Sequence, residues 1–210
     1  MPETKLSTRD ILSEVPAFRR LPDPQLQQLA DKALPLRYRI GQPMLRRETL
    51  PHQIAVIVEG QARLIGYDPQ SHSPITLKRL NRGELLGATG LLRGIPCETA
   101  IASTEVTCLT IPAQTFLSVL RHSSALQATV RDRCSVTEAF ELMGYILQNQ
   151  AEVSGDLREL ANQISDSADV RVLPPGSGLP GLSADRIWVV SSGTLGEYKA
   201  GDPLPDNPEA

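Results

Sequence analysis

The stretch between residues 38 and 111 consists of short apolar runs separated by glycine-containing turns, and this pattern restricts the fold more than any other feature. Ile54-Ala-Val-Ile-Val58 is the clearest run, and it ends at Gly60. Such runs, too short for helices and bounded by turn residues, are typical of buried strands. Many short strands at this spacing predict a β-roll of the jelly-roll or barrel kind. The other expected strands are 62–65, 75–80, 99–103 and 107–111.

Helical periodicity flanks the predicted roll on both sides. Residues 7–34 carry apolar side chains at helical spacing, and prolines divide them into separate short helices. Residues 124–150 carry the stripe Val136, Phe140, Met143 and Leu147, which predicts one long helix. The fold is therefore expected to be mainly β with flanking α. The long helix either closes over the roll with this stripe or uses it as the seam of a homodimer.

The tail after residue 150 predicts one short helix, over 156–165, and then strands at 170–173 and 187–190. The string Ile187-x-Val-Val-x-x-Gly193 repeats the form of the run that ends at Gly60. We therefore expect three parts. Residues 1–150 form the roll with its flanking helices, 151–169 a helical linker, and 170–210 a fragment of a second, degenerate β-roll in which Trp188 is buried.

Composition excludes several classes of function. The 210 residues carry a net charge of -3, which argues against a surface that binds duplex DNA. A helix-turn-helix would need two more helices after residue 150, and the tail predicts one short helix instead. No run approaches the roughly 18 apolar residues that span a bilayer, and the start does not resemble a signal peptide. Three scattered cysteines indicate reduced thiols and a cytoplasmic location. Neither a metal site nor a catalytic set of side chains has a recognisable spacing, so the chain is not expected to be an enzyme.

The stretch 83–103 resembles the phosphate-binding cassette of cyclic-nucleotide-binding domains, whose usual form is Gly-x-x-Phe-Gly-Glu-x-x-Leu-Leu, a few residues, then Pro-Arg-x-Ala. The resemblance covers residues 10–150 and implies the roll of the catabolite activator protein and of the kinase regulatory subunit. It also implies a set of ligand-binding positions in a degenerate cassette. Those positions are Gly83, Glu84, Leu86, Gly87, Ala88, Leu91, Leu92, Arg93, Pro96, Cys97 and Thr99.

The two residues that hold the nucleotide in the family are missing here. Ala88 stands where the family has Glu, which accepts a hydrogen bond from the ribose. Cys97, or Pro96 in a variant of the alignment, stands where the family has the Arg that neutralises the cyclic phosphate. Each lost contact is worth about 1.5–3 kcal/mol, so the affinity should fall by about two to four decades. A cyclic nucleotide is therefore disfavoured as ligand, no cofactor is expected, and Cys97 is interpreted as a small apolar filler.

Two further interpretations stay open. In a shifted alignment Glu84 and Arg93 take the Glu and Arg roles, and the chain is then a genuine receptor for cyclic AMP or cyclic GMP. Separately, Leu91-Leu-Arg-Gly-Ile-Pro-Cys-Glu98 resembles the N-terminal module of bacterial exporters that join a cysteine-peptidase domain to an ABC transporter. That resemblance implies a non-catalytic regulatory module on the cytoplasmic side of a peptide exporter, with peptidase and transporter domains as partners.

Overall fold

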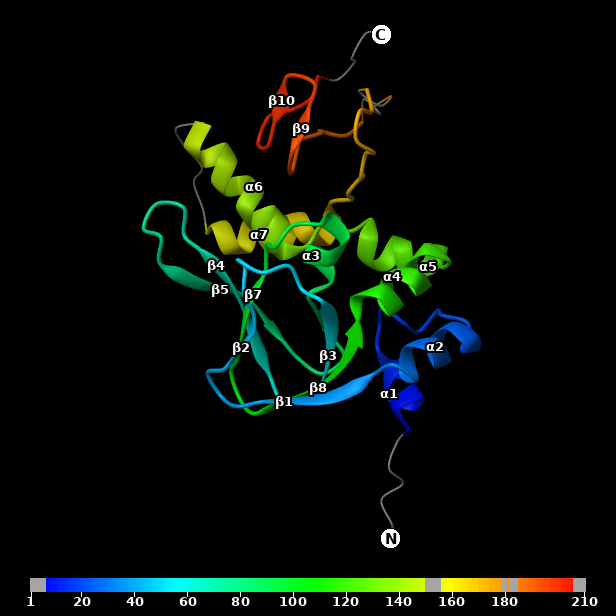
Figure 1. Cartoon of the computed structure of the whole chain (residues 1–210). Coiled ribbons are helices and arrows are strands. Elements are labelled where there is room, and N and C mark those ends of the chain that lie inside the picture. Colours follow the sequence, from blue (N-terminus) through cyan, green and yellow to red (C-terminus); the bar gives the residue numbers. More distant parts are fainter. Residues whose placement is uncertain (1–6, 150–155, 179–180, 182–184, 206–210) are drawn as a thin grey trace.

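Two four-stranded antiparallel sheets form the centre of the molecule and face each other (Figure 1). The computed structural model describes residues 7–149, 156–178, 181 and 185–205; the remaining parts of the three expected regions lie outside the described residues. One sheet has the order β1-β8-β3-β6 and the other β2-β7-β4-β5. The strands are β1 (Leu34–Tyr38), β2 (Pro43–Leu45), β3 (Gln53–Glu59), β4 (Ala62–Tyr67), β5 (Pro74–Leu80), β6 (Leu85–Leu86), β7 (Thr99–Ala102) and β8 (Val106–Pro112). The predicted jelly-roll type of fold is confirmed.

Strand β3 contributes to two separate apolar cores, because successive side chains of a strand point to opposite faces of the sheet. Ala55 and Ile57 point into the space between the sheets, together with Leu64, Leu86 and Ala100. Gly60, after this strand, cannot be replaced by a larger residue: its φ is 86° and an added Cβ would lie 2.0 Å from the carbonyl oxygen of Glu105.

The second core lies on the outer face of β3 and β8. Ile54 and Val56 of β3 pack there against the N-terminal helices α1 (Thr8–Glu14) and α2 (Asp23–Ala30). Helices α4 (Ala113–Arg121) and α5 (Ser124–Leu126) complete this cover. The largest side chains buried in it include Phe18 and Phe116. The short N-terminal helices predicted from the proline positions are confirmed.

The long helix expected over 124–150 is interrupted. It consists of α5, a π-helical turn η1 (Gln127–Arg131) and, after a break, α6 (Val136–Asn149). The break has a clear cause, because Ser135 caps α6: its backbone N–H donates to the Glu138 carboxylate over 2.9 Å, and its hydroxyl accepts from the Glu138 N–H over 3.2 Å.

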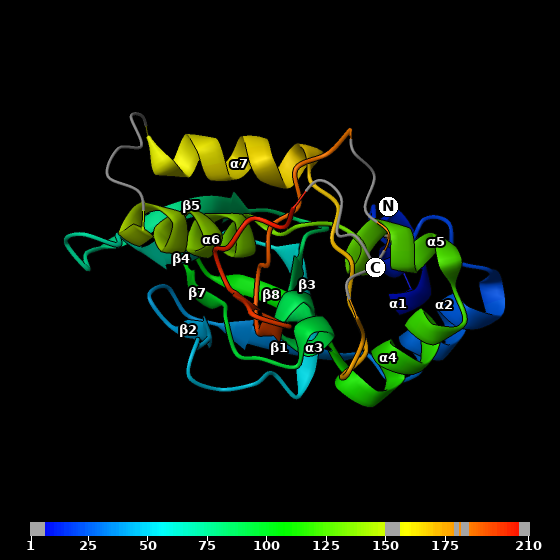
Figure 2. The same cartoon turned by 90° about the horizontal axis from the view of Figure 1, so that it is seen from above.

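Helix α6 closes the roll. Val136, Phe140 and Met143 of its apolar stripe are buried in the core between the sheets. Helix α7 (Leu157–Ser167) runs beside α6 on the side away from the strands (Figure 2), and it buries Ala161 in the same core. Of the two roles considered for the stripe, it therefore fills the one that covers the roll, and a homodimer seam on this helix would need another face.

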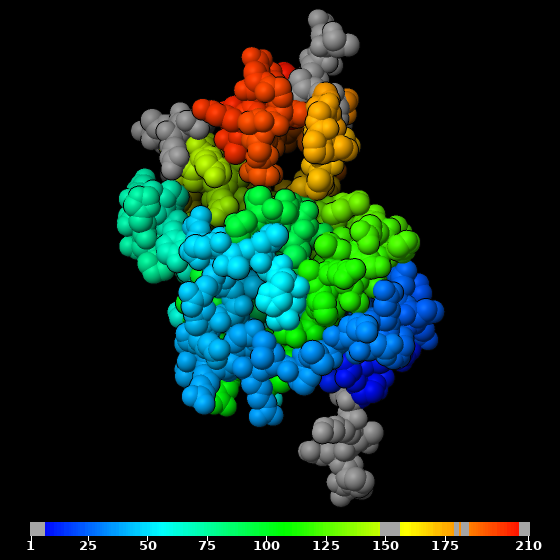
Figure 3. Space-filling view, in the orientation of Figure 1, coloured from blue at the N-terminus to red at the C-terminus, as the bar shows by residue number. Residues whose placement is uncertain are grey.

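The tail differs from the expected pair of strands. Neither 170–173 nor 187–190 forms a strand; the segment instead holds the short hairpin β9 (Thr194–Leu195) and β10 (Tyr198–Lys199) and a single bridge between Val189 and Pro203. Pro174, Pro175 and Pro203 lack the N–H that a ladder needs, which explains why strands do not extend here. The tail lies at the end of the molecule that carries α3 and α6 (Figure 3).

Burial in the tail is partial. Ile187 is 87% exposed, whereas Val190 is buried. Trp188 is half-buried, and the Arg171 guanidinium lies 4.8 Å from the centre of its ring. The tail therefore packs through few side chains, and its origin as part of a second roll stays a prediction.

Candidate functional site

The backbone of the cassette has the expected shape. Strand β6 leads into Gly87, which has a φ of 81°, then the short helix α3 (Ala88–Arg93) follows, and Gly94 ends it with a φ of 69°. Both glycines adopt the left-handed conformation that other residues avoid. A Cβ on Gly87 would also lie 3.1 Å from the carbonyl oxygen of Gln53, so the close approach of the cassette to β3 requires glycine.

The side chains expected at the site point in different directions. Leu86 is buried in the core between the sheets, whereas Ala88 is buried in the outer core, and Leu91 and Leu92 pack against the same outer core. Pro96 is exposed and Cys97 is buried, which places the Cys97 side chain, rather than that of Pro96, toward the interior. The structure therefore groups only part of the predicted set around one space.

That space is a cavity of about 190 Å³ between the β4–β5 hairpin and helix α6. Cys97 and Thr99 line its wall from the end of the cassette, and Thr137, Phe140 and Glu141 line the opposite wall from α6. Tyr67 lies on the hairpin side, and the Arg47 guanidinium lies 5.4 Å from the centre of its ring. This is the cavity that the cassette and the long helix enclose together.

The thiol at the expected arginine position carries no charge. Burial is the main cause that raises the pKa of Cys97 to about 12; the nearby carboxylates of Glu98, Glu141 and Glu138 act in the same direction, and Arg93 acts against them. A thiol in this environment stays protonated at neutral pH and is a weak nucleophile. Cys97 therefore supplies neither a cation for a phosphate nor a reactive thiolate.

Arg93 is buried in an ion pair with Glu138 and is fully engaged. The side chains of Arg93 and Glu138 are 6% and 11% exposed. The guanidinium also donates to the carbonyl oxygens of Arg131 over 2.8 Å and of Arg133 over 3.1 Å. Arg93 thus joins the cassette helix α3 to the break before α6, and it does not line the cavity beside Cys97.

Glu84, the other residue of the shifted alignment, is also occupied. Its carboxylate accepts from the backbone N–H of Asn81 over 2.7 Å and pairs with the Lys78 ammonium at 2.8 Å. It lies in the turn between β5 and β6, beside Gly83, and does not line the cavity next to Cys97.

Glu98 is a buried carboxyl at the end of the cassette that the sequence analysis did not single out. It is 8% exposed, and its Oε2 atom is buried without a hydrogen-bond partner in the described part of the chain. Burial raises the pKa of Glu98 to about 7, although the Thr89 hydroxyl and the backbone N–H groups of Gly90 and Gly87 lower it in part. The carboxyl therefore faces the start of α3. The family motif Pro-Arg-x-Ala allows any residue at the position of Glu98. The only signal in the sequence is that a charged residue stands next to a predicted buried strand.

The buried carboxyl of Glu98 should make the stability depend on pH. Its pKa is about 7 in the folded chain and near 4.5 in the unfolded chain, so the folded state binds the proton more tightly. The stabilisation is complete below pH 4.5 and is lost as the pH rises to about 7. We expect the free energy of unfolding to fall by about 2 kcal/mol between pH 5 and pH 8 through this group. Urea denaturation at both pH values measures the fall, and Glu98→Gln should remove it. An equal fall in the variant would contradict this assignment.

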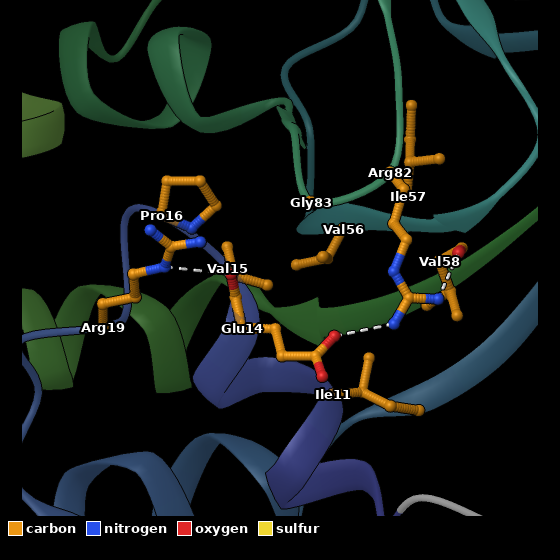
Figure 4. Close-up of a pocket in the computed structure, with 10 residues that line it drawn as sticks. All are labelled: Ile11, Glu14, Val15, Pro16, Arg19, Val56, Ile57, Val58, Arg82 and Gly83. Atoms are coloured by element: carbon orange, nitrogen blue, oxygen red, sulfur yellow. Dashed lines mark hydrogen bonds and ion pairs between the residues drawn. The ribbon is translucent and has the colours of Figure 1, made fainter.

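A second, larger cavity of about 290 Å³ lies between α1 and the outer face of β3. Figure 4 shows Ile11, Glu14 and Val15 on one side, Val56 and Val58 of β3 on another, and Arg82 across from Glu14. Glu14 and Arg82 form an ion pair at 2.8 Å, with side chains that are 54% and 55% exposed. The polar groups here are paired at the surface, whereas the cavity beside Cys97 contains buried polar groups. Within the described ranges, no cluster of three His, Cys, Asp or Glu side chains is placed to hold a metal ion.

Comparison with known proteins gives a match to one family model. Residues 35–123 match the model described as "Cyclic nucleotide-binding domain". This segment begins in β1 and ends after α4, so it includes both sheets and the cassette.

Solved structures with the same fold include regulatory and sensor domains. The regulatory domain of Toxoplasma gondii protein kinase A with cAMP has a TM-score of 0.54 at 17% identity, over 58% of this chain and 46% of that one. The regulatory subunit of a cAMP-independent protein kinase A from Trypanosoma cruzi, bound to guanosine, has a TM-score of 0.54 at 16% identity, over 76% and 50%. The sensor domain of the transcriptional regulator DNR from Pseudomonas aeruginosa has a TM-score of 0.51 at 16% identity, over 70% and 93%. This chain spans about half the length of the two kinase proteins, and identities this low establish the fold alone.

Proposed function

Because the roll over residues 35–123 belongs to the cyclic nucleotide-binding domain family, we propose that this chain is a non-catalytic regulatory module whose pocket no longer holds a cyclic nucleotide. The family membership accounts for the regulatory character. The loss of the ligand is the part that needs an argument from this chain's own side chains.

The observation that carries the proposal is the charge at the cassette. In the family, the backbone N–H groups at the start of the short helix and one arginine hold the cyclic phosphate. Here the corresponding N–H groups, those of Gly87 and Gly90, face the chain's own Glu98 carboxyl, and a neutral thiol replaces the arginine. A phosphate entering this site would meet a carboxyl and no unpaired cation. Transfer of an anion into a buried site without a counter-charge is strongly unfavourable.

The alternative, a genuine receptor that uses Glu84 and Arg93, has weaker support from the geometry. Arg93 already pairs with Glu138, and Glu84 already pairs with Lys78. Binding a phosphate through Arg93 would require breaking its buried ion pair with Glu138 and the two hydrogen bonds that the guanidinium donates to backbone carbonyls.

For the parent protein, we propose the peptide exporter that the string 91–98 suggests. The module would then lie on the cytoplasmic side and contact peptidase and transporter domains. None of the helices in the described residues has the length and apolarity that a bilayer crossing requires. The test is to express this module and the transporter part of the parent as separate chains and to measure whether they copurify; no copurification would contradict the contact.

Isothermal titration calorimetry with cyclic AMP and cyclic GMP tests the central proposal. We expect a dissociation constant no tighter than high micromolar for both, because no unpaired cation meets the phosphate. A low-micromolar constant that Glu84→Gln abolishes would establish the shifted alignment and overturn the proposal. Glu84→Gln suits this test, because its side chain is partly exposed and the substitution keeps its shape.

A further inference from the structure

We infer that the cavity beside Cys97 binds an uncharged nucleoside, a planar base joined to a hydroxylated sugar without phosphate. This inference rests on the proposed function, since it names what a cassette without a phosphate site takes instead. Four properties of the cavity support it: the sign of its charge, its unpaired polar atoms, its aromatic wall and its size.

The charges around the cavity disfavour an anion. Three carboxylates, those of Glu98, Glu141 and Glu138, act on Cys97, and one cation, Arg93, acts against them. Arg93 is paired with Glu138. Arg47, at the cavity wall, is paired with Glu141 at a distance of 3.5 Å. Because both guanidinium groups are compensated, neither is free to meet a phosphate or carboxylate in the ligand; His72 is the other basic side chain that lines the cavity.

A cation is disfavoured for the complementary reason. Glu141 is already compensated by Arg47, and burial raises its pKa. Glu98 is partly protonated near neutral pH, because burial raises its pKa to about 7. A buried ammonium would therefore have no full negative charge beside it, and burying it would be costly. The charges around the cavity therefore favour an uncharged ligand over an anion or a cation.

One polar atom in the wall lacks a partner. Thr137 is 2% exposed, lines the cavity, and its hydroxyl has no hydrogen-bond partner among the described residues. Buried hydroxyls are almost always hydrogen-bonded, so an orphan facing a cavity points to a group supplied by a ligand. A sugar hydroxyl can both donate to and accept from Thr137, and it can reach the Thr99 hydroxyl on the opposite wall.

The hairpin end of the cavity suits a flat ring. Tyr67, Phe140 and Pro69 present apolar surface there, and Arg47 lies over the Tyr67 ring. Planar heteroaromatic bases pack well between aromatic and apolar side chains. The volume of about 190 Å³ is smaller than the roughly 300 Å³ at which common ligand pockets begin. A compact ligand without a phosphate group fits this space better than a nucleotide. Helix α6 forms one wall, and it has to move slightly outward for the ligand to enter.

Calorimetry on the whole chain with adenosine, guanosine, adenosine 5′-monophosphate and cyclic AMP tests the inference. At least one nucleoside should bind with a dissociation constant below about 100 μM, and both phosphate-bearing ligands at least about tenfold more weakly. Thr137→Val should weaken nucleoside binding about tenfold, because it leaves the shape and removes the hydroxyl. Thr129→Val is the matched control, since Thr129 is exposed and its hydroxyl is bonded to the Ala125 carbonyl.

The outcomes separate this inference from the proposed function. If no ligand binds, the inference is wrong and the proposed loss of cyclic-nucleotide affinity stands. If cyclic AMP binds as tightly as adenosine, both are wrong. If a nucleoside binds but Thr137→Val behaves like Thr129→Val, the ligand occupies another site and the inference fails.

Discussion

Replacing Arg93 by alanine should lower the free energy of unfolding by about 3–5 kcal/mol, because it removes one partner of a buried ion pair and leaves the other charge unpaired. Glu138 is 11% exposed and would retain only the cap contact with Ser135. The carbonyl oxygens of Arg131 and Arg133 would lose their donor as well. Urea denaturation followed by circular dichroism measures the loss. Hydrogen exchange should also show faster opening of the first turn of α6, since Arg93 is the link between α3 and that helix end.

Arg82→Ala is the matched control for this prediction. It removes the same side chain from the ion pair with Glu14, in which both partners are more than half exposed. Exposed pairs contribute about 0–1 kcal/mol, so the control should change stability little. If Arg93→Ala and Arg82→Ala lowered the free energy of unfolding equally, Arg93 would not be the structural link described here.

The double substitution Cys97→Arg with Glu98→Ala should create affinity for cyclic AMP, by about 10- to 100-fold over the unaltered chain. It restores one charge-assisted contact to the phosphate, worth about 1.5–3 kcal/mol, and removes the carboxyl that faces the same backbone N–H groups. The cavity next to Cys97 offers room for the longer side chain. The measurement is calorimetric titration with cyclic AMP at pH 7.5.

Single substitutions distinguish the two contributions. Cys97→Arg alone should gain little, because the new guanidinium would pair with Glu98 rather than with a phosphate. Cys97→Ala with Glu98→Ala removes the carboxyl without supplying a cation, and it should also gain little. Equal affinity of Cys97→Arg with and without Glu98→Ala would show that Glu98 does not exclude the phosphate.

The roll was predictable because its signals are local. Runs such as 54–58 are too short and too β-branched for helices, and glycines such as Gly60 stand where the backbone needs a positive φ. The cassette was predictable for the same reason: Gly87 and Gly94 bracket a helix of six residues, and the motif specifies that spacing.

The parts that were missed depend on contacts between residues far apart in sequence. The break in the 124–150 helix needs Ser135 to cap α6, and Arg93, more than 30 residues earlier, to bind the carbonyl groups that the break exposes. Apolar periodicity continues through the break and hides it. In the tail, the string 187–190 has the composition of a strand, but Ile187 is 87% exposed and the pairing is limited, in the described part of the tail, to a bridge between Val189 and Pro203. The composition of a segment shows that it could form a strand, but the arrangement of the rest of the chain decides whether a neighbouring strand lies beside it.

Because the side chains of β3 alternate between two cores, both faces of this strand have to be covered in any fragment that is to fold alone. Ile54 and Val56 are 0% and 1% exposed only because residues before 34 and after 112 cover them. The family match, 35–123, excludes α1 and α2, so an excised fragment with those bounds would expose a continuous apolar face on its main sheet. The segment that matches the family model is therefore smaller than the segment whose apolar faces are all covered. A soluble excised version has to begin near Ser7 and retain α4 and α5 over the outer core and α6 over the core between the sheets.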